Sequence, residues 1–148
     1  MADIRPPSAK LLAEIGQLQQ QTAVALQLDL TDDPKRIVEK IRDYVTLVRD
    51  NRKILDEDQV AGLAVTLGEQ YVRQFGWDWN EVNFKGDYLD EHYVASILNP
   101  DKSLAIVPTW WIYDILEMEK SNGILLNFNM VEANRVPVGP PNEALIIH

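Results

Sequence analysis

The sequence predicts an α+β fold with three N-terminal helices, followed by a mainly antiparallel sheet of about four strands with one short inserted helix. Two observations support this prediction. Up to residue 76, apolar residues recur every three or four positions, which is the period of an amphipathic helix. After residue 76 they alternate, which is the period of a half-buried strand. The helices are therefore expected to precede the sheet.

Start signals place the three helices. Ser8 follows two prolines and is a suitable N-cap for the first helix. Asp33 and Pro34 begin the second, because Asp accepts hydrogen bonds from free N–H groups and Pro suits the first helical position. Asp56 and Gln59 have the spacing of a capping box, so the third helix is expected to begin there.

Glycines mark two features of the third helix. Gly62 and Gly68 lie in its interior, where each costs about 1 kcal/mol relative to Ala. Close approach of another part of the chain is the usual compensation, so we expect tight packing at both positions. Gly76 is expected to end the helix in the left-handed conformation.

Strands are predicted over residues 77–84, 93–98, 103–107 and 124–131. In the first strand Trp77 and Trp79 fall on one face, whereas Val82 and Phe84 fall on the other. This switch of face indicates a bulge near Asn80 and Glu81. Turn residues at 99–102 join the second and third strands into a hairpin. The short helix is expected to open at Pro108 and to end near residue 121, before the fourth strand.

The 148 residues have the length of one domain. Within 1–148 we expect a helical section (8–51), a helix-plus-sheet section (55–131) and an extended tail (132–148). A two-helix piece of about 50 residues is marginal alone, so the first section should pack against the rest. The apolar run 144–147 should either dock on the body or pair with another molecule.

Composition limits the class of protein. Without cysteine, disulfides and Cys-based metal sites are excluded. A net charge of −9 argues against nucleic-acid binding, which needs a basic surface. No apolar run is long enough for a membrane span and the first residues do not predict a signal peptide, so a cytoplasmic location is expected. The acidity serves solubility alone or a basic protein partner.

The best catalytic candidates are the polar neighbours Asp87, Asp90, Glu91 and His92. Carboxylates beside an imidazole can form a general base or a partial metal site. Their spacing matches no metal motif, and a polar loop that leads into a strand is the simpler explanation. The other histidine, His148, is the last residue of the sequence, so neither a metal site nor a cofactor is predicted.

The four tryptophans fall in two close pairs, 77/79 and 110/111. Packing in the core is the usual role of such residues. The alternative interpretation is an aromatic anchor in a protein interface. In that case Trp79 and Trp110, with the acidic neighbours Asp78 and Glu81, are the candidate binding residues.

A run from Leu67 to Trp79 begins Leu-Gly-Glu and ends Gly-Trp-Asp-Trp, and Ala105–Pro108 precedes the Trp110–Trp111 pair. Over roughly residues 58–118 this pattern resembles a bacterial family of domains of unknown function. The resemblance implies a helix that leads into a short sheet, then a turn and a helix bearing Trp. It implies no catalytic residues. Similar small acidic domains also serve as immunity proteins that neutralise toxins.

We therefore expect a non-enzymatic cytoplasmic protein-binding module, of immunity type by analogy, whose acidic surface meets a basic partner. Two alternatives stay open. One is a small hydrolase that uses the cluster from Asp87 to His92. The other is a homodimer that pairs through an exposed strand edge or through the tail.

Overall fold

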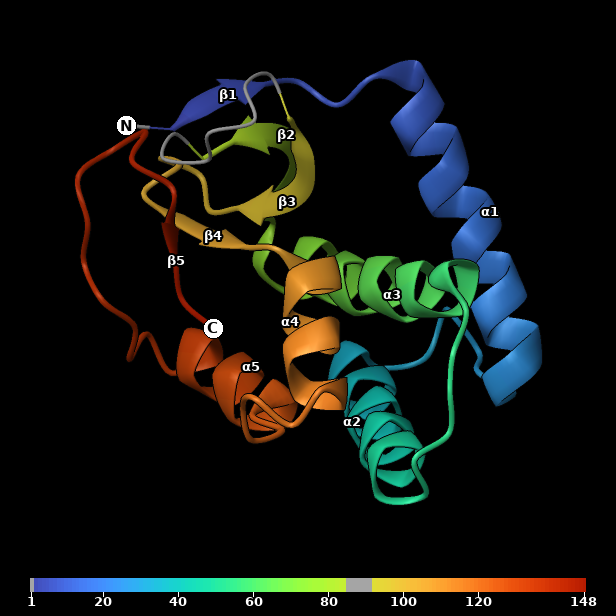
Figure 1. The fold of residues 1–148 in the computed structure, drawn as a ribbon. Coiled ribbons are helices and arrows are strands. Elements are labelled where there is room, and N and C mark those ends of the chain that lie inside the picture. Colours follow the sequence, from blue (N-terminus) through green and yellow to red (C-terminus); the bar gives the residue numbers. More distant parts are fainter. Residues whose placement is uncertain (1, 85–91) are drawn as a thin grey trace.

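The computed structural model describes residues 2–84 and 92–148 and confirms the α+β class (Figure 1). The elements, in chain order, are β1 (Asp3–Arg5), α1 (Ala9–Leu26), α2 (Pro34–Asp50), α3 (Glu57–Phe75), β2 (Asp78–Asn83), β3 (Val94–Leu98), β4 (Leu104–Ile106), α4 (Pro108–Leu116), α5 (Ile124–Glu132) and β5 (Leu145–Ile146). The three long helices thus come before most of the sheet, as predicted.

The strands of the described residues form one sheet in the order β1-β2-β3-β4-β5. Neighbours are antiparallel except for β4 and β5, which are parallel. The predicted antiparallel pairing of β3 and β4 is confirmed. Figure 1 shows the strands curled together at one end of the molecule, with the helices gathered beside them. The two edge strands β1 and β5 come from the two ends of the sequence and were not predicted.

Helix α3 is the central element of the fold. It packs against α1, α2, α4 and β3. All seven residues from Gly62 to Gly68 are buried, so this stretch of the helix has no solvent face. The polar groups there are satisfied within the helix: the Thr66 hydroxyl donates to the Gly62 carbonyl, and the Gln70 amide donates to the Thr66 carbonyl. This stretch of α3 is therefore part of the core.

The two interior glycines of α3 lie at close contacts, as predicted. A Cβ at Gly68 would come within 2.7 Å of the Trp79 ring and 3.1 Å of an Ile97 side-chain carbon. The sheet therefore rests directly on the α3 backbone at this point. Gly76 has a φ of 69° and ends the helix in the left-handed conformation, also as predicted.

The helix starts agree with the sequence signals, with one exception. The Ser8 hydroxyl accepts from the Leu11 N–H, and Asp56 with Gln59 forms the full capping box. Pro34 is the first residue of α2, but the Asp33 side chain makes no capping hydrogen bond. The Asp33 main-chain N–H instead donates to the Asp32 carboxylate, so the predicted side-chain cap is wrong.

The predicted bulge in the first long strand is wrong. The pairing of β2 with β3 is continuous from Asp78 to Val82, with no extra residue on either strand. The apolar residues move from one face of β2 to the other because both faces of the strand are covered. Trp79 packs into the core shared with the helices, and Val82 packs into a second, smaller core on the other face of the sheet.

The segment 124–131, predicted as a strand, is the helix α5 (Ile124–Glu132). Its buried residues are Ile124 and Phe128, four positions apart, and Leu125 and Val131 pack against the same core. Leu126, which alternation would place inside, is 64% exposed. A short run this rich in apolar residues fits both periods, and packing against α2 selects the helix.

The contact at Gly68 gives a test of the fold. We expect Gly68→Ala to lower the free energy of unfolding by about 1–3 kcal/mol, because the new methyl group overpacks the Trp79 and Ile97 side chains. Urea unfolding followed by circular dichroism measures the change.

Gly16 is the matched control, because it lies in α1 and a Cβ there would meet no atom within 4 Å. Gly16→Ala should raise the free energy of unfolding by about 0.5–1 kcal/mol, since Ala is the better helix former. Equal gains at Gly16 and Gly68 would show that the sheet does not rest on α3 as described.

Candidate functional site

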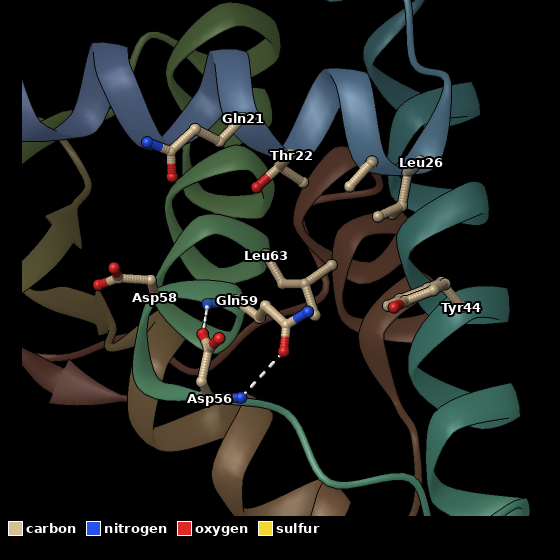
Figure 2. A pocket seen from close by; sticks show the side chains of 9 residues that line it. Gln21, Thr22, Leu26, Tyr44, Asp56, Asp58, Gln59 and Leu63 are labelled. Atoms are coloured by element: carbon tan, nitrogen blue, oxygen red, sulfur yellow. Dashed lines mark hydrogen bonds between the residues drawn. The ribbon is translucent and has the colours of Figure 1, made fainter.

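A groove follows the face of α1 that looks toward α3 and α2 (Figure 2). It lies beside the close contact between α1 and α3 at Thr22. A Cβ at Gly62 would meet the Thr22 hydroxyl at 2.2 Å and the Leu18 carbonyl oxygen at 3.4 Å. Gly62 therefore lets the two helices approach at Thr22, which confirms the predicted close packing at this glycine.

The central hollow of the groove has a volume of about 280 Å³. Its floor includes Thr22 and Leu63, which are 6% and 2% exposed, and Leu26, which is half-buried. Tyr44 of α2 closes one side (Figure 2). Side chains with polar ends line the other side, so the hollow combines an apolar floor with polar walls, as ligand sites commonly do.

The polar wall is the start of α3. The Asp56 N–H donates to the Gln59 side-chain oxygen at 2.9 Å, and the Gln59 N–H donates to the Asp56 carboxylate at 2.8 Å (Figure 2). This capping box holds both side chains in place beside the hollow. Asp58, in the first turn of the helix, and Gln21 of α1 complete the wall.

Two further hollows, of about 360 and 390 Å³, continue the groove in the two directions along α1. One is lined by Glu14, Gln17, Leu18, Gln21, Asp58 and Ala61. The other is lined by Ala25, Leu26, Gln27, Lys40, Asp43 and Tyr44. From Glu14 to Gln27 the helix rises about 20 Å. The groove is thus long enough for a segment of another chain.

The charges of the groove are unevenly placed. Asp43 at one end has Arg42 as an ion-pair partner at 2.9 Å, and Lys40 lies beside it. Near the start of α3, Asp56 and Asp58 have no ion pair within the described residues. Glu14 has a distant, exposed partner, Lys10 at 4.0 Å. The part of the groove from Glu14 to the start of α3 is therefore acidic.

The predicted anchor Trp79 is a core residue. It is 8% exposed, and its indole N–H donates to the Glu69 carboxylate at 3.0 Å. Trp110 on α4 is 39% exposed and its ring lies 5.5 Å from that of Phe84. The structure thus places the two tryptophans in different environments and leaves Trp110 with accessible indole surface.

Glu81, predicted as a binding residue, links the N-terminal segment to the sheet. Its carboxylate pairs with Arg5 at 2.9 Å and accepts from the Ser8 N–H at 2.7 Å, at the start of α1. These hydrogen bonds, that from Arg5 first, hold the pKa of Glu81 below its usual range. Asp78 on the same strand is exposed. The structure therefore gives Glu81 a role inside the fold.

Of the predicted catalytic cluster, Asp87, Asp90 and Glu91 lie outside the described residues, and His92 is exposed. Among residues 2–84 and 92–148, no three His, Asp or Glu side chains are grouped closely enough to hold a metal ion. In the same part of the chain, no helix combines the length and apolarity needed to cross a membrane.

Comparison with protein-family models, with curated proteins and with solved structures finds no match for this chain. Sequence reasoning did not predict the groove. Its signals were Gly62, which marks the contact of α3 with another element, and the glutamines of α1, which mark a polar helix face.

The contacts of Glu81 predict a pH-dependent contribution to stability. Because its pKa is lowered in the folded chain, the ionised carboxylate stabilises the fold above the unfolded pKa, and this contribution is lost as the pH falls through the folded pKa. Glu81→Gln should therefore lower the free energy of unfolding by about 1 kcal/mol at neutral pH. The loss should be smaller in acid, where the native carboxyl is also neutral.

Urea unfolding at neutral and at acid pH measures this effect. Asp78→Asn is the control, because Asp78 is on the same strand but has no ion pair within the described residues. If Glu81→Gln lowered the free energy of unfolding equally at both pH values, the ionised carboxylate of Glu81 would not be the group that stabilises the fold.

Proposed function

We propose that this protein is a non-enzymatic binding module that holds a basic, amphipathic segment of a protein partner in the groove along α1. One observation carries the proposal: a hollow of about 280 Å³ with an apolar floor is bordered by the carboxylates of Asp56 and Asp58, which have no ion pair within the described residues. A partner of opposite charge fits such a site, and apolar side chains fit its floor.

The groove offers three kinds of contact to such a segment. Leu26 and Leu63 at the floor offer apolar area, which drives association. Gln17 and Gln21 on α1 offer amide groups for hydrogen bonds to a main chain. The acidic part of the groove attracts Lys and Arg and raises the association rate.

The same carboxylates also stabilise the start of α3. Acidic side chains in the first turn interact favourably with the helix dipole, and Asp56 is the N-cap. Their presence alone therefore does not indicate a ligand. The proposal depends on their position beside a hollow with an apolar floor. A net charge of −9 extends the same complementarity to the rest of the molecule.

The partner class agrees with the resemblance to small acidic domains and with their use as immunity proteins. In that role, the basic segment would belong to a toxin, which the module would neutralise by covering its surface. We extend the proposal to this role by analogy. The proposal for the groove needs only a basic segment, whatever protein it comes from.

A peptide of defined composition tests the proposal. The groove runs about 20 Å along α1, so the probe is a helical leucine–lysine peptide of about 14 residues. We expect it to shift the NMR signals of α1 and of the start of α3, and to bind more weakly as the salt concentration rises. The variant Glu14→Gln with Asp58→Asn should weaken binding about 5-fold, from about 0.5 kcal/mol per exposed charge.

Two controls separate a site from general attraction to an acidic protein. The variant Glu117→Gln with Glu143→Gln removes two exposed charges outside the groove and should leave affinity within about 2-fold. A leucine–glutamate peptide of the same length should not bind. Equal losses in the two double variants, or shifts distributed over the whole surface, would refute the groove as the site.

A further inference from the structure

A second constellation lies where residues 144–148 meet the body of the protein. The main-chain N–H of Leu145 donates to the Ser103 carbonyl at 2.9 Å, and that of Ile147 donates to the Ala105 carbonyl at 3.1 Å. These bonds add β5 to the edge of β4. Ala144 is 2% exposed, so the segment is seated from its first residue. We call residues 144–148 the tail segment.

His148 anchors the tail segment. Its Nε2 accepts from the Val107 N–H at 3.0 Å, at the residue that precedes α4. Its ring is stacked on Trp111 of α4, with centroids 5.0 Å apart and planes 15° apart. The side chain therefore satisfies a main-chain donor and covers an aromatic surface at the same time.

Helices α3 and α5 hold Ile147, the residue that precedes His148. The Asn127 amide donates to the Ile147 carbonyl at 2.8 Å, and the Asn127 oxygen accepts from the Tyr71 hydroxyl at 2.7 Å. Burial raises the pKa of Tyr71, so this phenol stays a donor throughout the ordinary pH range. These bonds join α3, α5 and the tail segment in one chain of neutral groups.

The hydrogen bond from Val107 fixes the protonation of His148. A main-chain N–H is always a donor, so Nε2 must carry no proton, and the neutral ring then carries its proton on Nδ1. That Nδ1 is buried and has no hydrogen-bond partner among the described residues. A second proton would turn Nε2 into a donor that faces the donor of Val107. The docked geometry therefore accepts the neutral imidazole and rejects the imidazolium.

Burial and the positive charge of Lys120 also favour the neutral ring. Burial, and then the positive charge of Lys120, lower the pKa of His148 to about 4, and the negative charge of Asp114 opposes them. Lys120 lies at 3.5 Å from Asp114 and also donates to the main-chain oxygen of His148. Asn127 of α5, which lines the same hollow as His148, is neutral, and so is Tyr71 of α3, which donates to it.

We propose that the tail segment is a pH-sensitive clasp, which protonation of His148 releases from β4 and Trp111. The preceding chain permits this motion, because no helix or strand lies between Glu132 and Leu145 and Val138 is 99% exposed. Release removes the only strand beside β4 on that edge of the described sheet. The freed N–H and C=O groups of β4 then form an edge to which another strand can add.

The sign and size of the effect follow from linkage. A free imidazole binds a proton near pH 6.5 and the docked one near pH 4, so acidification favours the released tail between these values. The docking equilibrium should fall about 10-fold per pH unit in this window, and about 30-fold between pH 7.5 and pH 5.

Hydrogen exchange of the full chain, read by NMR, tests the proposal. We expect the amides of Leu145 and Ile147 to lose protection about 30-fold between pH 7.5 and pH 5, after correction for intrinsic exchange rates. The amides in the β2–β3 pairing should keep theirs. In His148→Gln, whose neutral side chain can still accept from Val107, the protection of the tail should not depend on pH.

His92→Gln is the matched control, because it removes the other histidine and should leave the wild-type profile unchanged. Circular dichroism at each pH confirms that all variants are folded. Tail protection that does not change with pH in the wild type overturns the proposal. So does an equal change in His148→Gln, or a parallel loss of protection in β2 and β3, which would be global unfolding.

Discussion

Close contact with the backbone of α3 is the constraint on which the rest of the structure depends. Seven consecutive buried residues leave this helix no solvent face between Gly62 and Gly68. Glycine at these two positions brings α1 to one side and the Trp79 ring to the other. A side chain at either place would separate the layers. The groove, the seat of the sheet and the position of α4 all follow from how closely these elements reach α3.

Local signals in the sequence predicted the parts of the fold that local physics decides. The starts of α1, α2 and α3 depend on residues within one turn, such as the Ser8 cap and the capping box of Asp56 with Gln59, and they were found. The end of α3 at Gly76 and the β3–β4 pair were found for the same reason. The two interior glycines predicted close contacts but not the elements that make them.

Features decided by distant residues were missed. In α5, Ile124 and Phe128 fit alternation as well as they fit a helix, and packing on α2 makes the choice. β1 and β5 are too short to show an apolar pattern in the sequence, and each forms only because it pairs with the edge of a neighbouring strand. Trp79 and Glu81 were proposed for a surface because the sequence does not show that β2 is covered on both faces. The groove was missed because three separate helices form it.

The groove and the tail segment both depend on α3, at opposite ends of the helix. Gln59 borders the groove, and Tyr71 holds Asn127 and through it Ile147. These positions are 12 residues apart, or about 18 Å along the axis. Position between two sites does not by itself couple them, because coupling needs an element with two arrangements. The buried stretch from Gly62 to Gly68 lies between them and is packed on every side, which leaves α3 one arrangement. We therefore expect release of the tail to leave the groove unchanged, so that the two surfaces act independently.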